Sequence, residues 1–222
     1  MSGFFDVLPE PERTRVVSIA RRRVFAKRTV VFHAGDPGDA MHVVRKGRFA
    51  VQNTSGGLDV NTMAILGPGD HFGELALLSG DSIRTASVVA LEAGETLSLH
   101  RVDFEKVLRE YPLASTVLLH ALRGQVERLS ARLVEALYVT ADTRVRHRLV
   151  ELATMYAAAD DPDGPVTIPL TQEDLASLAG TSRATVNRVL GEEKDAATVD
   201  VRRGKVAITD RTKLEARAAR GR

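Results

Sequence analysis

Turn-forming residues recur about every 8–12 positions between Val24 and Leu99 and then stop, and this change most constrains what the chain can fold into. The turn signals are Gly35-Asp36-Pro37-Gly38-Asp39, Gly47, Ser55-Gly56-Gly57, Gly67-Pro68-Gly69-Asp70, Ser79-Gly80-Asp81 and Ala93-Gly94. Between them lie short runs with β-branched or alternating apolar residues, including Thr29–Phe32, Met41–Val44 and Phe49–Val51. This spacing is typical of a β-sandwich or barrel, so we predict an all-β unit in the first half.

A helical pattern replaces the turns after Arg101. Pro112 interrupts it, and from Leu113 to about Val139 the chain has no Pro and a single Gly, which predicts one long helix. Apolar or small residues recur there at alternating intervals of three and four: Leu119, Leu122, Val126, Leu129, Leu133 and Ala136, followed by Thr140. That pattern is the seam of a two-stranded coiled coil and predicts a dimer interface. The alternative is an amphipathic helix lying on its own domain, whose apolar stripe is usually wider.

A second helical unit is predicted to begin at Thr140–Thr143, where hydroxyl and carboxylate groups can cap a helix. A loop at Ala159–Pro165 and a short β-like run at Val166–Leu170 follow. Thr171 then caps a helix that stops at Gly180, and Ser182 caps a second helix from Arg183 to about Leu190.

Two helices around a glycine turn suggest a helix-turn-helix, whose second helix enters the major groove of DNA by its N-terminal residues. Arg is the side chain best suited to a bidentate contact with guanine, so Arg183 and Arg188 are the predicted base readers. A hairpin with a basic tip at Arg202–Lys205 would add a wing. The candidate DNA-binding residues are Thr171, Ser182, Arg183, Thr185, Asn187, Arg188, Arg203 and Lys205. The alternative is a small helical hairpin with solvated arginines.

A candidate anion pocket lies in the β unit, where Gly73 is followed by a short helical turn within Phe72–Leu78 and Arg84-Thr85 begins ten residues after Glu74. Backbone N–H groups at the helix start, the Arg fork and the Thr hydroxyl can bind a phosphate, while Glu74 can accept from a sugar hydroxyl. A simple Glu74–Arg84 ion pair is the alternative. Four histidines, His33, His42, His71 and His100, raise a metal or haem alternative, but none stands at a ligand spacing, and we predict no metal.

Composition excludes several classes of protein. The chain has 222 residues, which favours two domains, and 44% hydrophobic and 27% charged residues, which argues against a disordered chain. It has no Cys, which removes disulfides, thiolate metal sites and a cysteine nucleophile. No run is long enough to span a bilayer and the N-terminus does not resemble a signal peptide, so we expect a cytoplasmic protein with no membrane partner.

The charge distribution and the lack of catalytic motifs also limit the possible functions. Residues 1–139 carry 17 Lys and Arg against 16 Asp and Glu, and residues 140–222 carry 14 against 13, so DNA binding must depend on a few local cations. No catalytic triad or carboxylate pair stands out, and we predict that the protein is not an enzyme.

The string Gly73-Glu74-Leu75-Ala76 with Arg84-Thr85-Ala86 resembles the phosphate-binding cassette of cyclic-nucleotide-binding domains. Together with the long helix and the C-terminal unit, nearly the whole chain is similar to the CRP/FNR family of bacterial transcription regulators. The resemblance implies an α+β fold with a β jelly-roll sensor at 1–111, a dimerisation helix at 112–139 and a winged helix-turn-helix at 140–222. It also implies a nucleotide site made by Gly73, Glu74, Leu75, Ala76, Arg84, Thr85 and Ser130.

The family further implies a homodimer that responds to a cyclic nucleotide, cAMP first, reads a palindromic DNA site and contacts RNA polymerase, in activators through a loop that matches residues 160–164 here. Two other functions stay open: an effector-independent regulator, and a nucleotide sensor that signals through a protein partner.

The chain departs from the family at three places. Leu129 and Ser130 stand where cAMP-binding members usually have Thr and a polar residue that reach adenine, so one base contact is lost. Because Leu129 also strengthens the seam, we expect a dimer that is competent for DNA binding without effector. Ala184 replaces a common Glu, which should relax one base position. The acidic stretch Gly191–Asp195 predicts that the recognition helix ends early and that DNA binding is weakened by repulsion.

Overall fold

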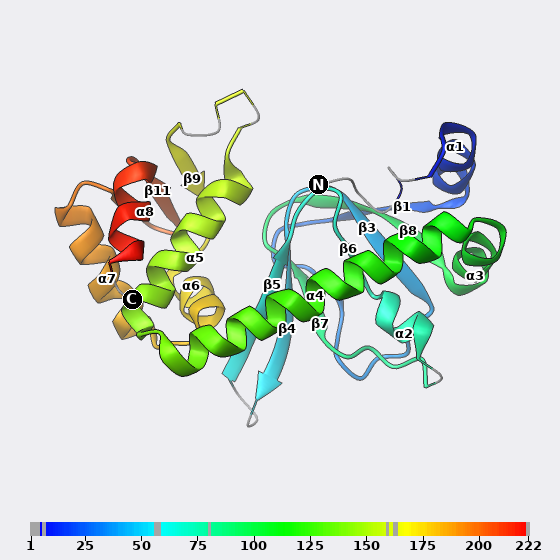
Figure 1. Cartoon of the computed structure of the whole chain (residues 1–222), viewed down its shortest axis with the longest axis horizontal. Coiled ribbons are helices and arrows are strands. Elements are labelled where there is room, and N and C mark those ends of the chain that lie inside the picture. Colours follow the sequence, from blue (N-terminus) through cyan, green and yellow to red (C-terminus); the bar gives the residue numbers. More distant parts are fainter. Residues whose placement is uncertain are drawn as a thin grey trace. The chain divides into compact units, whose positions relative to one another are not determined.

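The computed structural model describes residues 5, 8–55, 59–79, 81–158, 160–161 and 164–220 (Figure 1). The chain divides into two compact units, residues 1–58 with 63–128 and residues 59–62 with 129–222. The predicted turn residues Gly56, Gly57 and Gly80 lie outside the described residues, as do Ala159, Pro162 and Asp163 of the predicted loop.

Two four-stranded antiparallel sheets form the β part of the first unit. Their orders are β1-β8-β3-β6 and β2-β7-β4-β5. The strands are β1 (Arg21–Phe25), β2 (Val30–Phe32), β3 (Ala40–Lys46), β4 (Phe49–Ser55), β5 (Asp59–Leu66), β6 (His71–Phe72), β7 (Ser87–Ala90) and β8 (Gly94–His100). The predicted runs at 29–32, 41–44 and 49–51 correspond to β2, β3 and β4, and the jelly-roll prediction is confirmed.

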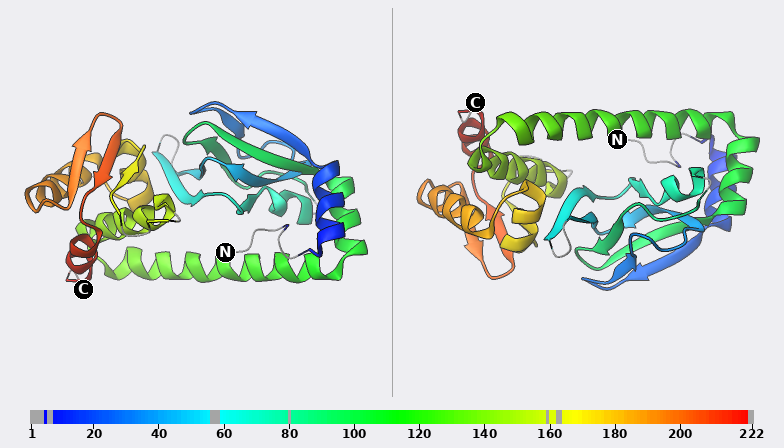
Figure 2. Two further views of the ribbon diagram at one scale, coloured as in Figure 1. Left: turned by 90° about the horizontal axis from the view of Figure 1, so that it is seen from above. Right: turned by 90° about the horizontal axis from the view of Figure 1, so that it is seen from below.

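Strand β3 is buried on both faces because it lies between two cores. Val44 faces a core between the sheets that includes Phe49, Phe72 and Val88, while Met41 and Val43 face a second core built with helices. The helices of this unit are α1 (Glu10–Ile19), α2 (Glu74–Leu78), α3 (Arg101–Glu110) and the first part of α4 (Pro112–Tyr138). Helix α1 lies beside α3, and residues of α1, α3 and α4 share the second core (Figure 2).

The predicted break at Pro112 is confirmed, since α3 ends at Glu110 and α4 begins at Pro112 itself. The first helical position tolerates proline because its N–H would have no partner inside the helix. Helix α4 then continues to Tyr138 without interruption, as the pattern predicts.

The second unit contains a helix-turn-helix with a small sheet. Its elements are α5 (Ala141–Tyr156), β9 (Val166–Ile168), α6 (Gln172–Ala179), α7 (Arg183–Asp195), β10 (Val199–Arg202), β11 (Lys205–Ile208) and α8 (Arg211–Ala219). The sheet has the order β10-β11-β9, and Gly204 turns the hairpin with a φ of 72°. Gly180 ends α6 in the left-handed conformation that glycine favours, with a φ of 58°.

Side-chain caps set the start of each helix around the turn. Thr171 and Asp174 form a reciprocal capping box on α6, and Ser182 Oγ accepts from Thr185 N at the start of α7. Thr140 caps α5 by accepting from Thr143 N. These three predicted caps are confirmed.

The prediction that the recognition helix ends early is wrong, because α7 continues through Gly191 to Asp195. Glu193 explains the difference. Its side chain is fully buried, with 0% exposed, and accepts from Arg146 Nε at 2.6 Å and from Arg217 Nε at 2.7 Å. Thr198 Oγ1 donates to the same carboxylate at 2.8 Å. Glu193 therefore belongs to the core of the unit, and the predicted repulsion of DNA by the acidic stretch stays a prediction.

The buried His42 predicts a pH dependence of stability. Its ring is stacked on Phe72 with centroids 5.0 Å apart, and Nδ1 lies 3.0 Å from Thr96 Oγ1. Burial, assisted by the charges of Arg84 and Arg23, lowers the pKa of His42 from 6.5 to about 3.

Between these two pKa values the unfolded chain binds a proton that the folded chain does not, so stability falls as the pH drops from 6.5 towards 3. We expect His42→Gln to reduce the slope of unfolding free energy against pH in this window by up to about 1.4 kcal/mol per pH unit. Urea unfolding at several pH values measures it, with the exposed His33→Gln as control. An unchanged slope in His42→Gln would contradict the assignment.

Candidate functional site

Glu74 occupies the first position of α2, directly after Gly73, whose φ of 86° lies in the left-handed region. Its side chain is buried, with 2% exposed, and Oε1 accepts from Gln125 Nε2 of α4 at 3.3 Å. The second carboxylate oxygen, Oε2, is buried and has no hydrogen-bond partner among the described residues. Buried polar atoms are nearly always satisfied, so an unpaired carboxylate oxygen is a candidate acceptor for a ligand.

Arg84 lies beside this carboxylate on the segment before β7, and it is 5% exposed. Nη1 donates to the carbonyl oxygen of Gly73 at 2.9 Å, and the guanidinium carbon lies 4.1 Å from the centre of the Phe32 ring. Nε is buried, and no residue in the described part of the chain accepts its hydrogen. Glu74 and Arg84 are both described, and no ion pair joins them, because Glu74 Oε1 accepts from Gln125 and Arg84 Nη1 donates to Gly73. The alternative of a simple Glu74–Arg84 ion pair is therefore wrong.

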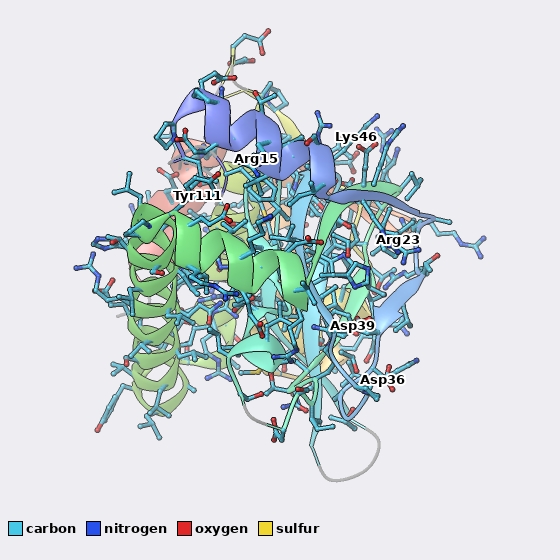
Figure 3. All side chains as sticks on the ribbon, turned by 90° about the vertical axis from the view of Figure 1, so that its right-hand side faces the viewer. Arg15, Arg23, Asp36, Asp39, Lys46 and Tyr111 are labelled. Carbon is cyan, nitrogen blue, oxygen red and sulfur yellow. The ribbon has the colours of Figure 1, made fainter. Side chains whose placement is uncertain are left out.

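The electrostatics around Arg84 are mixed. Burial lowers the pKa of Arg84 from its usual value, while the carboxylates of Asp39, Glu74 and Asp36 act in the opposite direction. Asp36 and Asp39 lie on the loop that connects β2 to β3 (Figure 3). A guanidinium remains charged in proteins, so the site holds a desolvated cation that no carboxylate contacts directly.

Two glycines make room for Arg84. A Cβ added at Gly38 would lie 2.5 Å from Ala76 Cβ and 3.0 Å from Arg84 Nε. A Cβ added at Gly73 would lie 2.6 Å from Arg84 Nη1. The turn signals in the sequence therefore also mark positions where the backbone must approach the arginine closely.

Arg101 supports the site, and the sequence reasoning did not identify it. Its Nη1 donates to Leu77 O at 2.9 Å, and Nη2 donates to Ala76 O and to Ser82 Oγ, each at 2.8 Å. These bonds satisfy carbonyls at the end of α2 and join them to the segment before Arg84. No local pattern reveals this role, since the partners lie 19 to 25 residues away.

The structure brings together most of the predicted nucleotide residues. Gly73, Glu74, Leu75 and Ala76 form the start of α2, and Arg84 bonds to Gly73. Thr85 follows and is exposed. Ser130 is an exposed residue of α4 that falls in the second unit.

The predicted seam residues of α4 are largely uncovered. Leu119, Val126, Leu129 and Leu133 have exposed fractions of 67, 62, 49 and 62%, and Ala136 is also exposed. Leu122 differs, because it is half-buried and packs on the core of the first unit. The pattern missed Val134, Leu137 and Tyr138, which are exposed on the same helix.

The helix-turn-helix places its predicted DNA residues at the surface. Arg183, Asn187, Arg203 and Lys205 are exposed. Within the described ranges, no ion pair engages Arg183, Arg203 or Lys205. The hydroxyls of Thr171 and Ser182 cap α6 and α7, and Thr185 Oγ1 lies 3.0 Å from Ser182 Oγ.

Arg188 differs from the other predicted DNA residues. It donates to both carboxylate oxygens of Asp142 in α5, with 2.8 Å from Nη1 to Oδ2, and to Glu192 Oε1 at 2.9 Å. The sequence alone did not predict either partner.

Comparison with known proteins bears on both units. Residues 22–111 match the cyclic nucleotide-binding domain family, and residues 143–217 match the Crp-like helix-turn-helix domain. The chain is 32% identical to the Cyclic AMP receptor protein of Thermus thermophilus over 96% of its length and 95% of that protein. The chain belongs to the CRP/FNR family of transcriptional regulators.

Other members of the CRP/FNR family support the assignment. A CRP-like cAMP-activated global transcriptional regulator of Mycobacterium tuberculosis is 28% identical, covering 87% of this chain and 86% of that protein. The crystal structure of the Thermus thermophilus catabolite activator protein has a TM-score of 0.55 at 30% identity, covering 99% of both chains. FixK2 of Bradyrhizobium japonicum, at 18% identity, shares the fold with a TM-score of 0.77 over 89% of this chain and 96% of its own.

No group of three or more His, Asp or Glu side chains that could hold a metal ion occurs in the described part of this CRP/FNR family member. Among the helices that the structure describes, none has the length and apolar character needed to cross a bilayer.

The close packing at Gly38 makes a testable prediction. Gly38→Ala forces Ala76 or the Arg84 guanidinium to move, and overpacking of this kind costs about 1–3 kcal/mol of unfolding free energy. We expect a lower melting temperature and loss of anion binding at Arg84, measured by thermal unfolding and nucleotide titration. Gly67→Ala is the matched control, since nothing lies within 4 Å of its added Cβ. Equal behaviour of the two variants would contradict the packing argument.

Proposed function

We propose that this chain is a homodimeric transcriptional regulator whose first unit binds a cyclic nucleotide and whose second unit reads a palindromic promoter site. The observation that carries the nucleotide part is the pair of buried atoms without partners, Glu74 Oε2 and Arg84 Nε. One is an acceptor that a hydroxyl group could satisfy, and the other is a cationic donor that an anion could satisfy. A sugar with a phosphate attached offers both groups.

The assignment of groups follows from charge. Arg84 and Thr85 hold the cyclic phosphate, because a guanidinium binds phosphate oxygens in bidentate fashion and a hydroxyl can donate to a third oxygen. Glu74 accepts from the ribose 2′-hydroxyl, since its charge would repel the phosphate. Gly73, Leu75 and Ala76 line the phosphate with backbone, and Ser130 is the residue that the family resemblance assigns to the base.

The favoured effector is cAMP. The Thermus thermophilus and Mycobacterium tuberculosis relatives are named for cAMP, and the phosphate and ribose groups here match that ligand. Leu129 cannot hydrogen-bond to adenine, so the base contributes less to binding than the sugar-phosphate. We therefore also expect cGMP to bind. The affinities for cAMP and cGMP should differ less than they would with a polar residue at position 129.

The dimer is supported by the apolar surface of α4. Leu119, Val126, Leu129 and Leu133 repeat at heptad spacing and remain exposed in a single chain. Exposed apolar rows of this kind mark protein–protein interfaces. Pairing two copies of α4 would bury them and would present two recognition helices to adjacent turns of DNA.

DNA recognition is assigned to α7 and the β10–β11 hairpin. Arg183 and Arg188 read guanines in the major groove, with Asn187 beside them, and Thr171, Ser182 and Thr185 contact phosphates. Arg203 and Lys205 at the hairpin tip add phosphate contacts. Such a regulator works in the cytoplasm with RNA polymerase as partner, and the loop at 160–164 is its proposed contact.

An effector-independent regulator is the second candidate, and Leu129 favours it. An apolar residue at this seam position stabilises the helix pair without any ligand, so the effector shifts the conformational equilibrium little. A nucleotide sensor that signals through a protein partner is the third candidate, and it requires a second unit that does not bind DNA.

Calorimetry with cAMP and cGMP tests the pocket. We expect both to bind, and we expect Arg84→Ala to weaken cAMP about 100-fold, because hydrogen bonds to a charged group contribute about 1.5–3 kcal/mol each. Arg45→Ala is the control, since this exposed arginine is also in the first unit. Absence of binding by the unmutated protein would favour the effector-independent candidate, and full affinity in Arg84→Ala would contradict the pocket.

Fluorescence anisotropy with labelled duplex DNA tests the regulator. We expect salt-dependent binding to palindromes that contain guanines opposite Arg183 and Arg188, selected from a random pool, with relaxed preference at the pair next to Ala184. Added cAMP should change the affinity by much less than 100-fold. A 100-fold gain would contradict the preformed dimer, and selected half-sites without guanine would contradict the base readers.

A further inference from the structure

Arg188 is held by two carboxylates, one of which comes from a different helix. Asp142 lies in the first turn of α5 and receives hydrogen bonds from both terminal nitrogens of Arg188, with Nη1 2.8 Å from Oδ2. Glu192, one turn further along α7, accepts the other Nη1 hydrogen at 2.9 Å. We call Asp142 and Glu192 the carboxylate clamp of Arg188.

The clamp leaves a defined set of donors. A guanidinium has five N–H groups, and three of them, two on Nη1 and one on Nη2, point at the clamp. Nε–H and the second Nη2 hydrogen form no hydrogen bond within the described residues. These two lie on the same edge of the fork and are parallel, which is the arrangement that pairs with guanine O6 and N7.

The clamp is tied to the core of the second unit. Arg146 donates to Glu192 Oε2 from Nη2 at 2.6 Å and to Glu193 Oε1 from Nε at 2.6 Å. Glu193 is fully buried and also binds Arg217. Glu192 is therefore fixed by a residue that is itself anchored in the interior, and this anchoring limits the positions that Arg188 can adopt.

Charge and side-chain entropy indicate that the clamp positions Arg188 and does not increase its attraction to DNA. The clamp brings two negative charges to one positive charge, so it reduces the attraction of Arg188 for phosphates. Arg188 is half-exposed, with 53% of its side chain accessible, and an unrestrained arginine would lose considerable rotamer freedom on binding a base. A clamp that fixes the Arg188 side chain in advance lowers the entropy lost on binding a base in that one orientation. Binding in other orientations remains unfavourable.

We propose that Asp142 is a specificity-determining positioning residue that holds Arg188 so that its free Nε–Nη2 edge reads one guanine in each half-site. The inference rests on the proposed DNA-binding function and adds a residue outside the recognition helix. The role of Asp142 is indirect, since Arg188 makes the base contact.

Asp142→Asn tests the clamp, because an amide keeps the size of the side chain but has one acceptor oxygen in place of the two that Arg188 Nη1 and Nη2 contact. The base pair that Arg188 reads is first identified as the one at which Arg188→Ala removes the preference for guanine. The preference for guanine over adenine at that pair is then measured by competition between duplexes. We expect Asp142→Asn to lower that preference about tenfold, in the range of one bidentate contact, without weakening non-specific binding. Adding Arg188→Ala to Asp142→Asn should remove only the remaining preference, because both changes act on one contact.

Two further variants complete the test. Asp200→Asn is the matched control, since it releases the wing residue Arg202, which Asp200 binds at 2.9 Å, and should leave the guanine preference unchanged. Arg188→Lys keeps the charge but removes the planar fork, so it should lose the preference while non-specific affinity stays within about twofold. Because Arg188→Lys leaves Asp142 in place, it tests the fork even where Asp142→Asn lowers the folding stability.

The failures are distinguishable. If the unmutated protein binds no duplex at low salt, the proposed function is wrong. If the unmutated protein binds specifically and Asp142→Asn keeps the full guanine preference, the clamp is wrong and the proposed function stands. A folded Asp142→Asn that binds its site more tightly with undiminished preference would show that Asp142 competes with DNA for Arg188, which also overturns the inference.

Discussion

The nearly complete burial of Arg84 without a carboxylate contact is the constraint on which the architecture of the first unit depends. Moving a guanidinium out of water is costly unless its donors are paired, and here Gly73 O satisfies one donor while Nε is left unpaired. Space for the group requires glycine at 38 and 73, and Arg101 holds the carbonyls of α2 in place beside it. The protein tolerates an unsatisfied cation, and the proposed anionic ligand would remove that cost.

The second unit buries a charge as well, but satisfies it internally. Glu193 has two arginines and a threonine as partners, so both of its carboxylate oxygens are satisfied within the unit. The same residues extend the recognition helix beyond its predicted end and fix the carboxylate that contacts Arg188. The first unit thus leaves a buried charge for the proposed ligand, whereas the second unit pairs its buried charge internally and through Arg146 also holds Glu192, a partner of Arg188.

Local patterns were sufficient for many of the elements, although they did not predict α1 or α8. Glycine and proline spacing predicted the strands and the break before α4, and the hydroxyl residues at 140, 171 and 182 predicted three helix caps. These features depend on residues within about four positions of each other. The prediction failed where a charge found its partner far away, as with Glu193, whose acidic character near a glycine indicated a helix end but whose partners stand 24 and 47 residues away.

The sequence by itself determined the two-unit α+β architecture, the long helix with its apolar seam and the candidate residues around Glu74 and Arg84. Each of these depends on the spacing of residues that are close in the chain, and backbone chirality and hydrogen-bond geometry relate that spacing to local structure. Only the tertiary structure decided that Glu74 and Arg84 stay apart, that Arg101 braces α2 and that Asp142 holds Arg188. Such contacts join segments distant in the chain, and which oppositely charged groups meet depends on burial and packing that no local pattern contains.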